Sequence, residues 1–94
     1  IFRGDFLRAW GTLFKKNRRI ASASSTSDIS DVSEALNDCL ESIYKQLDIS
    51  EPVWVSKHAR ELSRFSRTKF YPADFVEPVN FDHLEIEFTM LDED

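Results

Sequence analysis

Residues 28–48 read DISDVSEALNDCLESIYKQLD and form the one stretch of the sequence long and regular enough to bury a broad apolar face. Asp31, followed by Glu34 three residues later, approximates a capping box near its start. Apolar residues recur in it at the spacing of one helical face. They are Ile29, Val32, Ala35, Leu36, Cys39, Leu40, Ile43 and Leu47. The stretch therefore predicts a long amphipathic helix on which the rest of the chain packs.

Residues 6–24, which precede this helix, have the pattern of a β-hairpin with a polar KKNR turn. The rival interpretation is a helix from Asp5 that has Phe6, Trp10, Leu13 and Phe14 on one side. Gly11 would weaken that helix at its centre, so the hairpin is preferred. The Ser/Thr-rich residues 22–27 are expected to connect the hairpin to the long helix.

Three segments follow the long helix, which Pro52 terminates. Residues 57–66 predict a short second helix with Ser56 as N-cap. Residues 70–81 contain two prolines and predict an irregular segment pinned by aromatic side chains. Residues 82–91 alternate apolar and polar side chains, as a half-buried strand does.

The expected order of elements is β-β-α-α-β in a single domain, residues 1–94. A last strand needs a partner, and the hairpin supplies the other strands that the sequence predicts. The fold class is then α+β: a two-layer domain with a three-stranded antiparallel sheet, one long helix packed on it and a short second helix. In this arrangement Glu85 and Glu87 are expected to lie across from Arg8 or Lys15, where opposite charges help.

Several segments of the chain resemble those of a family of small uncharacterised bacterial proteins. These segments are TLFKKNRRI, PVW with KH and E after it, FSRTKFY, DFVEPV and FDHLEIE. That family has a hairpin, two helices and a final strand. The resemblance implies the order of elements over most of the chain, and it implies no function and no site residue.

The net charge of −5 hides alternating blocks of charge along the 94 residues. Residues 1–20 and 57–69 are basic, with balances of +5 and +4, whereas residues 21–56 and 70–94 are acidic, with balances of −6 and −8. No apolar run approaches the roughly 20 residues of a membrane span, so a protein without membrane contact is expected. The single cysteine excludes an internal disulfide and favours the cytoplasm.

No residue pattern indicates catalysis, a cofactor or a resident metal, so a non-enzymatic protein is expected. Cys39 lies in the middle of the apolar stripe, where a buried structural thiol is the preferred interpretation over a nucleophile. His83, Glu85 and Glu87 share a strand face and are weighed as metal ligands, but a solvated face is preferred. His58 is interpreted as a surface side chain.

Two candidate binding features remain. The first is a basic patch that a nucleic acid could use, although neutralisation by the acidic blocks is the preferred interpretation. It comprises Lys15, Lys16, Arg18, Arg19, Lys57, Arg60, Arg64, Arg67 and Lys69. The second is an apolar face made by Phe6, Trp10 and Phe14, for which the chain offers no obvious cover. The alternative is that residues 70–81 or the second helix cover this face.

These features predict an interaction or structural module that self-associates, as a homodimer, through its sheet face. A homodimer or another protein partner is thus expected. The alternative is an accessory protein that binds nucleic acid through the basic hairpin turn and the basic second helix.

Overall fold

The computed structural model describes residues 5–92 and shows two helices packed with an antiparallel sheet, which confirms the α+β class. The sheet has four strands, so the expected three-stranded sheet is wrong. The elements are β1 (Asp5–Lys15), β2 (Arg18–Ser27), α1 (Val32–Leu47), α2 (Ser56–Phe65), β3 (Arg67–Phe70), a 3-10 turn (Pro72–Asp74) and β4 (His83–Asp92).

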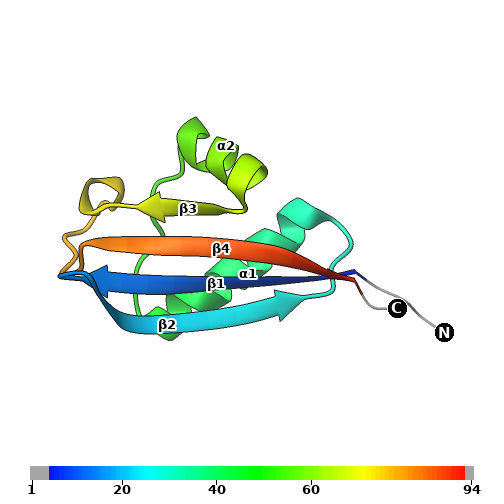
Figure 1. Ribbon diagram of the computed structural model, residues 1–94, viewed down its shortest axis with the longest axis horizontal. Coiled ribbons are helices and arrows are strands. Elements are labelled where there is room, and N and C mark those ends of the chain that lie inside the picture. Colours follow the sequence, from blue (N-terminus) through cyan, green and yellow to red (C-terminus); the bar gives the residue numbers. More distant parts are fainter. Residues whose placement is uncertain (1–4, 93–94) are drawn as a thin grey trace.

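The strand order across the sheet is β2-β1-β4-β3, and every neighbouring pair is antiparallel. The last strand is therefore central, paired with β1 on one side and β3 on the other (Figure 1). The expected pairing of the last strand with the first is confirmed, but the charge partners differ. Glu85 and Glu87 lie opposite Thr12 and Trp10 on β1, and opposite Lys69 and Arg67 on β3.

The β1–β2 hairpin turns at Lys16 and Asn17, which both have positive φ, 53° and 65°. Two consecutive positive φ values are what a type I′ turn needs to match the twist of the strands. The register shifts between Leu13 and Phe14, so Ile20 is an extra residue on β2. Strand β2 continues to Ser27, and the expected connector at residues 22–27 is therefore wrong.

Helix α1 has Asp31 as its N-cap, and the Asp31 side chain accepts a hydrogen bond from the Glu34 N–H at 3.1 Å. It ends at Leu47, and its C-cap Asp48 adopts the left-handed conformation that commonly terminates helices. Ile29 precedes the helix and Val32 begins it, and both are exposed, so the buried stripe is shorter than expected. Tyr44 is an additional buried residue of α1.

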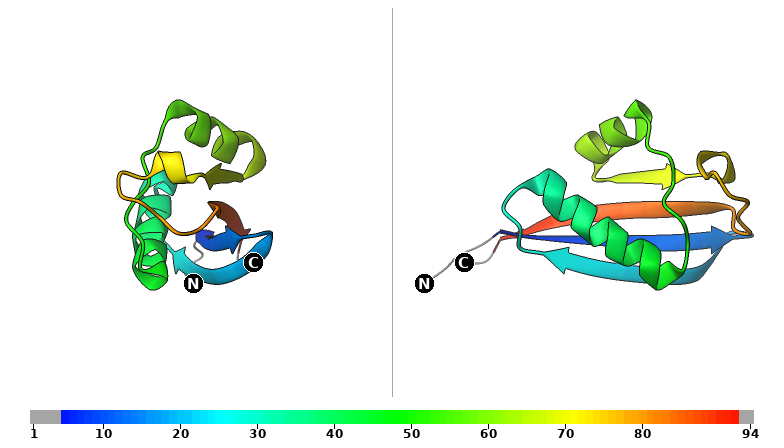
Figure 2. Two further views of the ribbon diagram at one scale, coloured as in Figure 1. Left: turned by 90° about the vertical axis from the view of Figure 1, so that its left-hand side faces the viewer. Right: turned by 180° about the vertical axis from the view of Figure 1, so that it is seen from behind.

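Helix α1 lies across one face of the sheet, and the opposite face carries no helix in the described chain (Figure 2). Gly11 lets this approach happen, because a Cβ there would come within 2.8 Å of Ile43 Cγ2 on α1. The segment after β3 adds Phe75 and Phe81 to the core, their rings meeting edge to face at 5.4 Å between centroids. The sheet thus has an inner, helix-covered face and an outer face.

Within residues 5–92, neither helix has the length and apolar character that crossing a membrane requires.

Candidate interaction surface

The outer face of the sheet is set by strand alternation. Along β1, Leu7, Ala9, Gly11 and Leu13 are buried against the helix layer. The residues between them point to the opposite side. Of these, Trp10 and Phe14 are half-buried, while the Phe6 side chain lies outside the described part of the structure.

Aromatic rings gather at the hairpin end of this outer face. Phe14 is paired with His83 on β4, and their rings stack at 4.7 Å with an interplanar angle of 15°. Tyr71, just after β3, lies on the other side of the histidine, 5.8 Å away between ring centroids. The stack shields part of Phe14 and leaves Tyr71 45% exposed. Tyr71 belongs to residues 70–81, the alternative cover considered for this face, and it reaches Phe14 only through His83.

Charges on the outer face belong mainly to β3 and β4. Arg67 Nη1 lies 3.9 Å from Glu85 Oε2, and Lys69 lies opposite Glu85 in the register. The pair is partly exposed, so its contribution to stability is small. The considered metal ligands His83, Glu85 and Glu87 do not form a site: the described residues contain no group of three potential ligands close enough to hold an ion.

The candidate basic patch divides into two groups. Lys15, Lys16, Arg18 and Arg19 surround the β1–β2 turn, and the other five residues lie on α2 and β3. Among the described residues, Arg67 is the one member of the patch that forms an ion pair. Neutralisation by the acidic blocks, the preferred interpretation, is supported by this ion pair, by Asp82, whose carboxylate accepts a hydrogen bond from the Lys16 N–H, and by the position of Lys69 opposite Glu85.

A hollow of about 360 Å³ lies between α2 and β3. Lys57, Arg67 and Lys69 line it together with Glu61, Thr68 and the exposed rings of Phe65 and Tyr71. Phe65 was expected on the apolar side of the second helix but is 63% exposed, because α2 buries only His58 and Leu62. Cations and aromatic rings thus share one concave surface next to the outer face.

A second hollow, of about 670 Å³, separates α1 from α2. Apolar side chains from both helices line it, with Phe88 of β4 between them. They include Val32, Leu36 and Leu40 of α1 and Leu62 of α2. The two helices therefore do not close over this part of the sheet, which explains why Val32 is exposed although it belongs to the apolar stripe.

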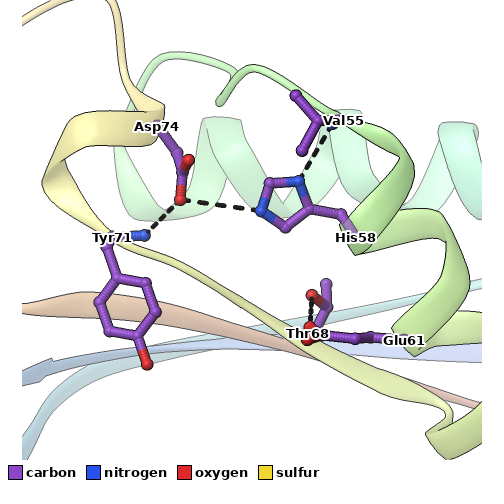
Figure 3. A network of polar contacts seen from close by, with 6 residues as sticks. All are labelled: Val55, His58, Glu61, Thr68, Tyr71 and Asp74. Atoms are coloured by element: carbon purple, nitrogen blue, oxygen red, sulfur yellow. Dashed lines mark hydrogen bonds and ion pairs between the residues drawn. The ribbon is translucent and has the colours of Figure 1, made fainter.

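His58 is 1% exposed and holds α2 against the segment after β3 (Figure 3). Its Nδ1 accepts a hydrogen bond from the Val55 N–H, and its Nε2 lies 3.7 Å from Asp74 Oδ2. The ring also stacks on Phe70 at 4.2 Å and meets Trp54 edge to face. The expected surface position of His58 is wrong, because the ring replaces the expected Ser56 cap and fills the core.

Two further buried groups belong to α1. Cys39 is fully buried, its Sγ–H directed at the Leu7 carbonyl 3.9 Å away, and burial raises the pKa of the thiol. Both properties make the thiol unreactive. The Tyr44 hydroxyl is buried without a hydrogen-bond partner. Burial raises the pKa of Tyr44 to about 12, while the nearby Trp54 side chain opposes this rise without reaching hydrogen-bond geometry.

Comparison of the chain with models of protein families, with curated proteins and with solved structures gave no significant match.

Proposed function

We propose that the protein is a non-enzymatic interaction module of the bacterial cytoplasm that self-associates through the outer face of its sheet. The observation that carries the proposal is the state of Trp10 and Phe14. Both rings stand on a face that no described helix covers, and both remain partly exposed. A face with large aromatic side chains and no cover is the usual character of a binding surface.

The free energy gained by burying the two half-exposed rings favours the binding of another protein surface to this face. Full burial of an aromatic side chain contributes about 1.5–3 kcal/mol, so two half-buried rings leave a substantial gain unrealised. Ser22 and Ser24 flank Trp10 on β2 and are exposed, so one edge of the indole stays open. A second copy could cover both rings at once by packing its own outer face on them.

Light scattering on the wild type and on Trp10→Glu tests the proposal. We expect a wild-type oligomer at micromolar concentration and a folded variant of lower mass. Val76→Glu is the matched control, because Val76 is 84% exposed in a loop and its replacement should leave the mass unchanged. Should Trp10→Glu unfold, Tyr71→Glu adds the same charge at an exposed ring of the face. An unchanged mass for both face variants would contradict self-association through this face.

Nucleic-acid binding is the second candidate, and one observation favours it. Eight of the nine candidate patch residues make no ion pair with the described residues, and Arg67 and Lys69 stand beside the exposed ring of Tyr71. Cations that contact phosphates, next to rings that stack on bases, are the elements of single-strand recognition.

Fluorescence anisotropy with a labelled single-stranded oligonucleotide tests this candidate. Binding should weaken steeply with added salt and be lost on joint replacement of Arg18, Arg19, Arg64 and Arg67 by alanine. Tyr71→Ala should weaken binding with little change in its salt dependence, because stacking releases no counterions. Absence of binding at low salt would remove the candidate.

A further inference from the structure

The two edges of the sheet differ in how they are protected against pairing. Edge strand β3 has only four residues, carries Arg67 and Lys69, and lies beneath α2 (Figure 1). The Thr68 hydroxyl donates a hydrogen bond to Glu61 Oε1 at 2.6 Å, which ties the strand to that helix. Short length, charge and cover are the devices that prevent edge-to-edge pairing.

Edge strand β2 lacks most of these devices: its one side-chain hydrogen bond to a helix in the described structure is that from Gln46 to the Ser24 carbonyl. It spans ten residues, and from Ile20 to Ser27 it contains no charge and no proline. A hollow of about 560 Å³ runs beside it, lined by Arg8, Trp10, Ser22, Ala23, Ser24 and Gln46. The bulge at Ile20 bends only the end next to the turn, so residues 21–27 remain available.

The free backbone groups of β2 can be identified from one contact. Every second residue of an edge strand directs its N–H and C=O away from its partner strand. The Ser24 carbonyl accepts a hydrogen bond at 3.0 Å from Gln46 Nε2 on α1. Ser24 therefore belongs to the outward-directed set, together with Ser22 and Thr26. Counting from the hydrogen-bonded pair that closes the Lys16–Asn17 turn gives the same set.

We propose that β2 is a self-pairing edge, through which two copies join antiparallel about a two-fold axis at Ser24. Ser24 then faces its own copy, and Ser22 faces Thr26 of the other chain. The result is one continuous sheet of eight strands, twice the four of each copy. This contact is independent of the outer-face association proposed above, and the two can coexist because one uses an edge and the other a face.

A second copy of the chain is the partner that the charges favour. Strand β2 begins with Arg18 and Arg19, and the acidic Asp28 and Asp31 follow it. Antiparallel pairing about Ser24 brings the basic start of each strand towards the acidic segment of the other. Between these ends the paired side chains are small and uncharged, so a two-fold contact sets no like charges against each other. The incoming Ser24 N–H takes the place of Gln46 at the Ser24 carbonyl.

Amide hydrogen exchange followed by NMR tests the contact directly on the full chain. In concentrated protein the amides of Ser22, Ser24 and Thr26 should exchange about tenfold or more slowly than on dilution, because pairing protects them. Association through the outer face alone leaves these three amides unprotected. Fast exchange of all three at every concentration would therefore overturn the proposal, whatever the oligomeric state.

A charge-swap pair tests the position of the axis. Ser24→Lys and Ser24→Glu each place like charges opposite one another at the axis, and both should lose the concentration-dependent protection of Ser22 and Thr26. An equal mixture of the two variants should regain it. Ser50→Lys, a change at an exposed loop residue, is the matched control and should keep wild-type protection. A mixture that stays unprotected would overturn pairing about Ser24.

Discussion

His58 Nδ1 accepts a hydrogen bond from the backbone N–H of Val55, three residues earlier, at 3.1 Å. A nitrogen that accepts carries no proton, so in the neutral ring the proton is on Nε2 and faces the Asp74 carboxylate. Asp74 in turn accepts a hydrogen bond from the Tyr71 N–H at 2.8 Å. One imidazole thus caps α2 and joins it to the 3-10 turn after β3.

Replacing His58 by alanine should lower the free energy of unfolding by about 2–4 kcal/mol, since it removes the cap and leaves a cavity beside Phe70. His58→Phe restores the ring volume without the cap and should lose less. Arg60→Ala, at an exposed position of the same helix, is the control and should change stability by less than about 0.5 kcal/mol. Urea unfolding measures all three, and equal losses in His58→Ala and Arg60→Ala would contradict the burial of His58.

The two faces of α1 and β4 should differ sharply in their tolerance of truncation. Leu40 and Ile86 are 3% and 0% exposed, and each change to alanine should cost about 2–5 kcal/mol. Their neighbours Glu41 and Glu87 point away from the core, so Glu41→Ala and Glu87→Ala should cost much less. Thermal or urea unfolding of the four variants checks this. A loss for Glu41→Ala as large as that for Leu40→Ala, or for Glu87→Ala as large as that for Ile86→Ala, would mean that the assigned faces are wrong.

Gly11→Ala should destabilise the protein by about 1–3 kcal/mol, because the added Cβ overpacks the core. That atom would lie 2.8 Å from Ile43 Cγ2 and 3.2 Å from Ile86 Cδ1. Ile43→Ala removes the nearer contact, so the double variant should lose less stability than the sum of the two single losses. A double-mutant cycle measures this coupling, and strict additivity would show that α1 does not lie as close to β1 as the structure has it.

The free energy of unfolding of the protein should fall at strongly alkaline pH because of Tyr44. Burial raises the pKa of Tyr44 to about 12 in the folded state, whereas an exposed tyrosine in the unfolded chain titrates near 10. Above about pH 10 the unfolded chain therefore releases the proton first, and at about pH 11 roughly 1.4 kcal/mol of stability is lost. Tyr44→Phe should lack this loss, and its stability at neutral pH should be close to that of the wild type because the hydroxyl has no partner.

Urea unfolding of the wild type and Tyr44→Phe at neutral pH and at about pH 11 isolates the effect of this hydroxyl from that of other alkaline groups. An equal fall in both proteins would show that Tyr44 titrates as an exposed tyrosine does.

The hairpin and α1 were accessible from the sequence because their signals are local. Two runs flank a polar turn, and the Asp31 cap precedes a regular apolar stripe. Strand β3 gave no such signal. Its four residues, RTKF, continue the basic character of α2, and only the left-handed Ser66 separates the two elements. What makes β3 a strand is pairing with β4, a contact between distant segments that no short window of sequence contains.

The same distinction holds for the candidate surface. Alternation along β1 predicted that Trp10 and Phe14 share a face, because that depends on one strand alone. The stack of Phe14, His83 and Tyr71 depends on the β1–β4 register and on the position of β3, so it could not be predicted from any single segment. The prediction of a surface position for His58 was wrong for a related reason. Its basic sequence neighbours indicated exposure to solvent, whereas its hydrogen bond to the Val55 N–H and its stacking on Phe70 form only in the folded chain.

The central position of β4 also constrains how the chain folds during synthesis. Strand β1 is synthesised before β4, with which it pairs on one side, so that side stays open until residues 83–92 have left the ribosome. Until then, Leu7, Ala9 and Leu13 have only β2 and α1 to cover them. Contacts between such distant segments slow folding, and a nascent chain with an open apolar edge is the state in which chaperones would be expected to bind.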